Sequence, residues 1–346
     1  MTTKKYLFYI SQNYAFEILR PLQSAMLNAG AQVVWFVSGN EVTLSNFNND
    51  EIVLNSIAEA VSFNSDACFI PGNVIPSFIP GLKVQVFHGL EWKKKGHFVI
   101  RECFDLYCTH GNATTKRFNE LADEHNFFDV KETGWPKLDQ LFSTPPITLF
   151  KDEKPIILYA PTFSPSLTSA PILFEKIKLL TQKSDYNWLV KFHPKMDVHW
   201  INAYKNLSSD NFNIIESANI NELLQSADIM ISDTSSVIGE FSLLAKPVVS
   251  FNNSEPGDYL ININQVDDLP KAIKQALSPS TELLDAINNY AQELHPYKDG
   301  QSSTRIINAV EQILKNGKKA NKPLPLNLFR NIKQRLKLKY WKNIFR

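Results

Sequence analysis

Residues 227–251, ADIMISDTSSVIGEFSLLAKPVVSF, contain the clearest sign of the fold class. A short apolar run at 229–232 predicts a buried strand, and a helical pattern follows as far as residue 244. The apolar run at 247–251 predicts the next strand. A strand, a helix and a second strand in this order indicate a parallel sheet with helices packed on its faces.

The same alternation continues outward on both sides of this stretch. Toward its N-terminal side, strands are expected at 156–159, 188–192 and 212–215, and helices at 173–183 and 220–226. In the first half of the chain, strands are expected at 6–10, 32–37, 67–70, 83–87 and 105–109, and a helix at 14–29. Two consecutive doubly wound α/β halves predict a GT-B-type fold, in which two Rossmann-like domains face each other across a cleft.

The length of 346 residues, of which 44% are hydrophobic, suits two domains with separate cores. Residues 143–154, STPPITLFKDEK, contain two prolines and a charged cluster, which is typical of a segment between domains. We therefore expect domains at 1–145 and 146–315, followed by a basic tail at 316–346.

The formal net charge of +1 conceals an uneven distribution. No acidic residue follows Glu311, whereas 11 of the 36 lysines and arginines do. The preceding part therefore has 36 minus 11, or 25, basic residues against 35 acidic ones, a net charge of −10. Nucleic acids require a broad basic footprint, so this charge distribution argues against a nucleic-acid partner.

The basic tail also has a helical spacing of apolar residues. These residues are Leu328, Phe329, Ile332, Leu336, Tyr340, Ile344 and Phe345, with Trp341 as a further aromatic residue. Lysines and arginines fill the gaps, which predicts an amphipathic helix on an anionic membrane surface. A helix packed on the protein's own body and a disordered basic end remain as alternatives.

The start of the chain does not read as a secretory signal, because its apolar run ends at Ser11. No apolar stretch reaches the roughly 18 residues that span a bilayer. Cys68, Cys103 and Cys108 show neither a disulfide framework nor the spacing of a zinc site. We expect reduced cysteines in a peripheral protein at the cytoplasmic face of the cell membrane.

The first cluster of chemically capable residues is VFHGLEWKKKG, residues 86–96. A strand is expected to end at His88, and Gly89 permits a sharp turn. A histidine in this position suits a general base, and Lys93, Lys94 and Lys95 suit a phosphorylated acceptor. A solvated basic loop after a partly buried histidine explains the same residues.

The second cluster is LVKFHPK, residues 189–195. Here Pro194 ends a predicted strand directly after His193, and Lys191 and Lys195 flank that histidine. An ordinary strand end is the alternative for this segment alone. Two strand-end histidines, one in each half, predict that His88 and His193 face one phosphate across the cleft.

The third cluster is a hydroxyl-rich turn between the strand at 229–232 and the helix that follows it. It consists of Ser232, Asp233, Thr234, Ser235 and Ser236. Hydroxyls and free N–H groups at a helix N-terminus bind phosphate, whereas ordinary capping needs only one hydroxyl. Glu240, one turn into the helix, is placed to hold a ribose hydroxyl.

The fourth cluster is DGQSSTRI, residues 299–306. Ser302 and Ser303 are expected to open a helix, and Arg305 follows them. An aspartate and a glycine before a serine also form a plain turn and cap.

Together with GWPKLD, residues 134–139, these segments resemble the CDP-glycerol glycerophosphotransferase family. Its members carry WHG-T-P-L-K-K-x-G, GYP-x-x-D, a strand ending in HP, S-D-Y-S-S with a later D-K-P, and D-G-x-x-[ST]-x-R-I. This chain has VFHGLEWKKKG, GWPKLD, KFHP, SDTSS…LLAKP and DGQSSTRI in the same order. It departs from the family at Phe87, Leu90, Glu91, Thr234 and Glu240.

The resemblance implies a GT-B fold and transfer of glycerol phosphate or ribitol phosphate from CDP-glycerol or a related CDP-polyol. The acceptor would be a hydroxyl of a lipid-linked saccharide or a polyol-phosphate polymer in teichoic acid or capsule synthesis. Residues 1–145 would form the acceptor side and residues 146–315 the donor side. His88 would deprotonate the acceptor, and His193 would help neutralise the donor diphosphate as CMP leaves.

The resemblance also assigns binding residues, and it implies neither a metal nor a cofactor, because cationic side chains and a helix N-terminus supply the charge stabilisation. The implied donor-binding residues are Lys191, Ser232, Asp233, Thr234, Ser235, Ser236, Glu240, Ser302, Ser303 and Arg305. The implied acceptor-binding residues are Gly89, Lys93, Lys94 and Lys95.

Three other functions fit the same residues. A GT-B glycosyltransferase would use the hydroxyl-rich turn and Glu240 for a nucleotide sugar. A nucleotide-sugar 2-epimerase shares the fold. A non-catalytic GT-B module would bind a lipid-linked glycan or a partner enzyme.

Overall fold

The computed structural model describes residues 3–90, 96–216 and 219–342. It consists of two compact units, and the chain enters the first of them twice. The first unit contains Met1–Gln140 and Leu294–Arg346, and the second contains Leu141–Glu293. The expected fold class of two doubly wound α/β halves is confirmed, but the chain returns to the first unit at residue 294 and not after the expected boundary at 315.

The described part of the first unit contains a seven-stranded parallel sheet of order β3-β2-β1-β4-β5-β6-β7. Its strands are β1 Lys5–Ile10, β2 Gln32–Val37, β3 Val53–Leu54, β4 Ala67–Ile70, β5 Leu82–Gln85, β6 Leu106–Thr109 and β7 Asp129–Glu132. Strand addition changes direction between β1 and β4. This change makes their carboxyl ends a topological switch point, where sheets of this kind bind ligands.

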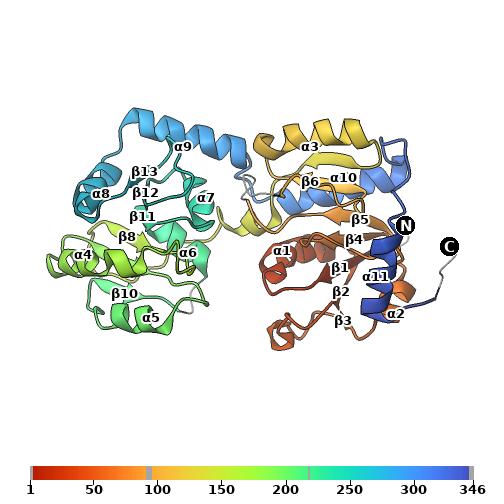
Figure 1. Cartoon of the computed structure of the whole chain (residues 1–346), viewed down its shortest axis with the longest axis horizontal. Coiled ribbons are helices and arrows are strands. Elements are labelled where there is room, and N and C mark those ends of the chain that lie inside the picture. Colours follow the sequence, from red (N-terminus) through yellow and green to blue (C-terminus); the bar gives the residue numbers. More distant parts are fainter. Residues whose placement is uncertain (1–2, 91–95, 217–218, 343–346) are drawn as a thin grey trace. The chain divides into compact units, whose positions relative to one another are not determined.

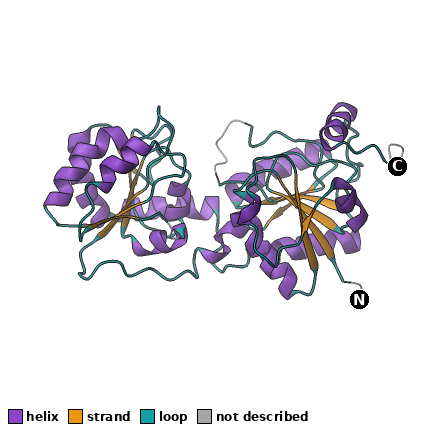
Figure 2. Cartoon of the chain, turned by 90° about the horizontal axis from the view of Figure 1, so that it is seen from below, coloured by secondary structure: helices purple, strands orange, loops and turns teal. Residues whose placement is uncertain are grey.

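Helices pack on both faces of this sheet (Figures 1 and 2). They are α1 Ala15–Asn28, α2 Ile57–Phe63, α3 Asn112–His125, α10 Ser302–Asn316 and α11 Leu328–Leu338. Short 3₁₀ turns lie at η1 Leu44–Asn46 and η2 Pro136–Gln140. The core is strongly aromatic, since Phe8 meets both Trp35 and Phe69 edge to face. The indole N–H of Trp35 donates to Gln23 at 2.7 Å, so this buried polar atom is satisfied.

The described part of the second unit contains a six-stranded parallel sheet of order β10-β9-β8-β11-β12-β13. Its strands are β8 Ile156–Tyr159, β9 Asn187–Val190, β10 Phe212–Ile214, β11 Ile229–Ser232, β12 Val248–Phe251 and β13 Ile261–Ile263. Its helices are α4 Ala170–Gln182, α5 Val198–Lys205, α6 Ile220–Ser226, α7 Val237–Ser242, α8 Leu269–Leu277 and α9 Thr281–Leu294, with a turn at η3 Val266–Asp268. The switch point here lies between β8 and β11.

Most strands in buried apolar runs lie where the sequence predicts them, and the expected strands at 32–37, 67–70, 156–159 and 229–232 have those bounds. Three expected strands and one expected helix end early. The strand expected at 83–87 stops at Gln85, because the backbone turns sharply at Phe87, whose φ is 56°. The strands expected at 188–192 and 212–215 stop at Val190 and Ile214, and the helix expected to reach 244 stops at Ser242.

The returning chain is attached to the first unit by the side chain of Asp139. Its two carboxylate oxygens accept hydrogen bonds from the N–H groups of Ser302 and Ser303, both at 2.8 Å, and so cap α10. Gly134 lies in the left-handed region at φ 79°, and a Cβ there would lie 2.5 Å from the Ser302 hydroxyl oxygen. The GWPKLD and DGQSSTRI segments are therefore two sides of one packed contact.

The tail is also part of the first unit. The amine of Lys318 donates to Asp105 at 2.8 Å, and the Asp129 carboxylate accepts from the N–H groups of Lys319 and Ala320. Beyond α11, Tyr340 is buried and stacks on Phe78 with ring centroids 5.0 Å apart. The helix expected in this region is present, but Tyr340 belongs to the core and not to its exposed apolar face.

We expect that Asp139→Ala destabilises the first unit by about 1–2 kcal/mol, because two N–H groups at the start of α10 lose a charged acceptor. Urea unfolding followed by circular dichroism measures this change. Gln312→Ala on the exposed face of the same helix is the matched control. Equal stability of the two variants would show that the Asp139 cap is unimportant.

Candidate active site

A strained turn presents His88 at the end of β5. Phe87 has a positive φ of 56°, a conformation that costs a non-glycine residue energy. Two contacts hold it there: its N–H donates to Gln85 Oε1 at 3.4 Å, and its carbonyl accepts from the indole of Trp135 at 3.4 Å. The left-handed residue of this turn is thus Phe87, and Gly89, which was expected to permit the turn, does not have a positive φ.

His88 is exposed, and its environment defines its tautomer. Nδ1 lies 3.3 Å from the carbonyl oxygen of Pro71, which can only accept a hydrogen bond. The proton therefore sits on Nδ1, and Nε2 is left with a free lone pair. The ring lies 5.4 Å from that of Tyr14, which fixes its plane. This arrangement suits a general base. Lys93, Lys94 and Lys95, expected beside it, lie outside the described residues.

Three further histidines lie behind the His88 turn. His97 stacks on Phe87 at 5.2 Å, and His110 meets the same ring edge-on at 5.3 Å. His295, from the returning chain, accepts the backbone N–H of Trp135 at 3.0 Å. Burial lowers the pKa of His97 and of His295 to about 4, and it also lowers the pKa of His110 well below its ordinary value. They are neutral packing partners that support the turn.

In the second unit, Asp233 organises the loops at the switch point. Its carboxylate is fully buried and accepts from the N–H of Thr162 at 2.9 Å and the N–H of Ser169 at 2.8 Å. Burial raises its pKa, while these hydrogen bonds oppose that rise. The hydroxyl of Ser232 donates to the carbonyl of Ala160 at 2.6 Å. Both residues thus hold the loop that follows β8.

Of the other residues in the hydroxyl-rich turn, some bond to neighbouring loops and some are exposed to solvent. The Thr234 hydroxyl accepts from the N–H of Ser254 at 3.0 Å, which attaches the loop after β12. Ser235 is half-buried and Ser236 is exposed, and Ser236 makes no side-chain cap bond. Glu240 is 5% exposed and lies within the six-residue α7. Of this cluster, Ser235 and Ser236 are best placed to meet a ligand.

His193 is connected to that turn through the loop after β8. Its ring stacks on Phe163 at 4.2 Å, and Phe163 directly follows Thr162. Nδ1 accepts the N–H of Lys195 at 3.0 Å, so the proton of the neutral ring is on Nε2. Burial and the Lys195 charge lower the pKa of His193. His193 therefore presents an N–H donor, the opposite tautomer to that of His88.

The remaining expected donor residues have partners within their own units. The amine of Lys191 donates to the carbonyl of Glu216 at 2.7 Å. Arg305 stacks over Tyr297 at 3.9 Å and pairs with Asp299. Ser302, Ser303 and Arg305 were expected in a domain at 146–315, and the structure places all three in the first unit. Among the described residues, no group of three or more His, Cys, Asp or Glu is arranged to hold a metal ion.

Two doubly wound parallel sheets, each with candidate residues at the carboxyl ends of its strands, define a protein of the GT-B class. Comparison with solved structures agrees with this class. The wall teichoic acid polymerase TagF aligns over 90% of this chain and 89% of its own, with a TM-score of 0.61 and 15% identity. The UDP complex of MnaA from S. aureus aligns over 93% of this chain and 100% of its own, with a TM-score of 0.63 and 15% identity.

The fold alone does not assign the chain to a family, but the sequence does. Residues 15–312 match the family model described as CDP-glycerol:poly(glycerophosphate) glycerophosphotransferase, and the chain belongs to that family. The resemblance drawn from the motifs is thereby confirmed.

Curated relatives are similar over parts of their length. The teichoic acid glycerol-phosphate primase of Bacillus subtilis (strain 168) is 33% identical over 179 residues, which are 48% of this chain and 46% of the primase. The teichoic acid ribitol-phosphate primase of Bacillus spizizenii is 24% identical over 297 residues, or 73% of this chain and 75% of that protein. The chain thus spans less than half of the first relative.

The buried histidines predict a loss of stability in mild acid. Their pKa values in the folded protein lie below the ordinary value of 6.5, so the free energy of unfolding is highest above pH 6.5 and decreases as the pH falls toward 4. In that range each of these histidines lowers the free energy of unfolding by up to about 1.4 kcal/mol per pH unit. In urea titrations from pH 7 to pH 5, His295→Gln should reduce this slope, because one proton fewer is taken up on unfolding.

The matched control is Gln312→Ala, which changes an exposed side chain of the same unit that does not titrate. Its slope should equal that of the wild type. An unchanged slope in His295→Gln would contradict the neutral state that we assign to His295.

Proposed function

We propose that this chain transfers glycerol phosphate or ribitol phosphate from CDP-glycerol, or a related CDP-polyol, to a hydroxyl of a lipid-linked saccharide or polyol-phosphate polymer. The observation that carries this proposal is the pair of histidines that follow β5 and β9, with Nδ1 of His88 3.3 Å from a carbonyl oxygen and Nδ1 of His193 3.0 Å from a backbone N–H. Family membership supports the reaction class. The relatives named as glycerol-phosphate and ribitol-phosphate primases support the two polyols.

In this mechanism, Nε2 of His88 removes the proton from the acceptor hydroxyl. The resulting oxygen attacks the phosphorus that bears the polyol, a new phosphodiester bond forms, and the bond from that phosphorus to the CMP oxygen breaks. Nε2–H of His193 donates to a phosphate oxygen and so stabilises the developing charge. Ser235 and Ser236 provide further donors for the diphosphate. The proton remains on His88 until solvent removes it.

We predict that His88→Ala lowers the rate of CMP release from CDP-glycerol by at least about 100-fold, because the general base is lost. The rate is measured with a soluble saccharide acceptor, and the product mass identifies the transferred group. His125→Ala should retain the wild-type rate. Wild-type turnover by His88→Ala would exclude His88 as the base, and release of UDP from UDP-sugars by the wild type would favour a glycosyltransferase or an epimerase.

We also propose peripheral attachment to an anionic membrane through α11. Its inner face is held by Arg335, which is 5% exposed and stacks on Phe78 at 4.6 Å. Its outer face keeps an apolar stripe in solvent. The stripe consists of Leu328, Phe329, Ile332 and Leu336, which are 63%, 81%, 52% and 60% exposed.

The charge around this stripe suits an anionic lipid surface. Every charged residue after Glu311 is basic, and each near-surface lysine or arginine contributes about 1 kcal/mol of attraction. The apolar stripe and the basic flanks together are typical of a helix that lies in the headgroup layer. No helix among the described residues has the length and apolar character needed to cross a bilayer.

We expect the double variant Phe329→Glu with Ile332→Glu to bind phosphatidylglycerol vesicles at least about tenfold more weakly, because two apolar side chains no longer enter the lipid layer. Vesicle co-sedimentation measures the effect. Leu44→Glu with Ile52→Glu changes two similarly exposed apolar residues elsewhere in the first unit and should bind normally. Unaltered binding of the α11 variant would refute attachment through this helix.

A further inference from the structure

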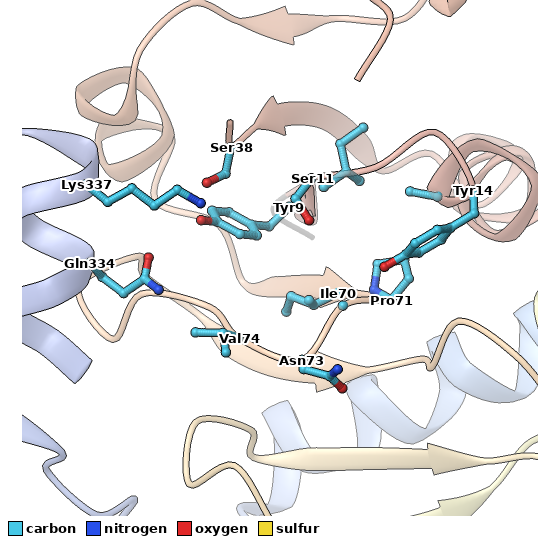
Figure 3. A pocket seen from close by; sticks show the side chains of 13 residues that line it. Tyr9, Ser11, Tyr14, Ser38, Ile70, Pro71, Asn73, Val74, Gln334 and Lys337 are labelled. Atoms are coloured by element: carbon cyan, nitrogen blue, oxygen red, sulfur yellow. The ribbon is translucent and has the colours of Figure 1, made fainter. Parts of the chain in front are cut away.

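The first unit contains a cavity of about 220 Å³ at its switch point (Figure 3). Its walls come from the carboxyl ends of β1, β2 and β4 and from α11, which contributes Gln334 and Lys337. The sequence did not predict it, because it joins residues from both ends of the chain. Its position is where a doubly wound sheet binds a ligand.

The lining of the cavity is rich in hydroxyl groups. Tyr9, Ser11, Tyr14 and Ser38 contribute them, and Lys337 adds a cation. Figure 3 shows the Ser38 hydroxyl and the Lys337 amine directed into the same part of the cavity. Burial raises the pKa of Tyr9 to about 12, so its hydroxyl remains a hydrogen-bond donor near neutral pH.

Ser38 and Tyr9 form a pair of hydroxyl groups in this cavity. Ser38 is 2% exposed, and its hydroxyl interacts with the hydroxyl of Tyr9, which also lines the cavity. Hydroxyl donors beside an amine, with no Asp or Glu among the described lining residues, match the oxygens of a phosphate group. Glu41 is the nearby acid, and its charge acts on Tyr14 at the rim.

The cavity adjoins the proposed base. Pro71 and Tyr14 line it, and the same two residues contact His88, at 3.3 Å through the Pro71 carbonyl and at 5.4 Å between rings. A molecule held in the cavity is therefore positioned beside His88. The helix that supplies Lys337 also carries the exposed apolar stripe on its other side. In an acceptor that carries a phosphate and a lipid chain, the phosphate matches the face with Lys337 and the lipid chain matches the face with the apolar stripe.

We propose that this cavity is the subsite for the phosphate group that joins the acceptor to its lipid, and that Lys337 is the cationic partner of that phosphate. This proposal rests on the proposed function, which supplies the lipid-linked acceptor. The same chemistry occurs in the headgroups of bulk membrane phospholipids, so the test must separate these two sources.

Isothermal titration of the full chain with farnesyl diphosphate, below its micelle concentration and without a donor, tests the subsite. Lys337→Met should weaken binding at least about tenfold, because a charge-assisted contact is lost. Lys333→Met, an exposed lysine on the same helix that does not line the cavity, should bind as the wild type does. Equal affinities of the two variants would overturn the proposal.

Ser38→Ala keeps the test independent of folding. Its unfolding temperature without ligand should fall only slightly, because a single hydroxyl contact, with Tyr9, is lost. The increase in that temperature on adding farnesyl diphosphate should be smaller than in the wild type. An undiminished increase would contradict the role of Ser38 in the subsite.

Two further measurements separate the possible failures. Phosphatidylglycerol vesicles that displace farnesyl diphosphate in proportion to their headgroups would assign the cavity to bulk lipid and overturn the acceptor assignment. Absence of such competition would support it. CMP release by the wild type with a soluble acceptor tests the proposed function alone. If the chain binds farnesyl diphosphate through Lys337 but releases no CMP, the subsite is supported and the proposed function is overturned.

Discussion

The contact between Asp139 and the first turn of α10 is the interaction on which the rest of the first unit depends. One carboxylate caps two N–H groups and so joins a segment near residue 139 to one near residue 302. This contact places His295 behind the Trp135 backbone, and Trp135 in turn supports the strained Phe87 turn. The path from Asp139 to His88 thus consists of a few short hydrogen bonds and ring contacts.

Asp233 has the corresponding role in the second unit. It was interpreted from the sequence as a donor-binding residue, yet its carboxylate is buried and bonded to the loop after β8. The acid inside this motif therefore holds the loop that shapes the site. The neighbours that these acids position are candidates for ligand contact, namely His88 in one unit, and His193, Ser235 and Ser236 in the other.

The parallel sheets were predictable because their strands are buried on both faces and read as continuous apolar runs. The two strand-end histidines were predictable for the same reason. The return of the chain was not, because helical periodicity shows that 302–316 is a helix but not which sheet it covers. The histidines behind Phe87 and the cavity at Ser38 and Lys337 were also not predicted from the sequence, because each feature combines residues that are far apart in the chain.

The insertion of one unit within the other has a consequence for synthesis on the ribosome. Residues 141–293 are complete, and able to form their own core, before residues 294–346 have been made. Until then the earlier sheet lacks α10 and the segment bonded to Asp105 and Asp129. The second unit is therefore expected to reach its native state before the first unit does. The first unit can be completed only after residues 294–346 have been synthesised.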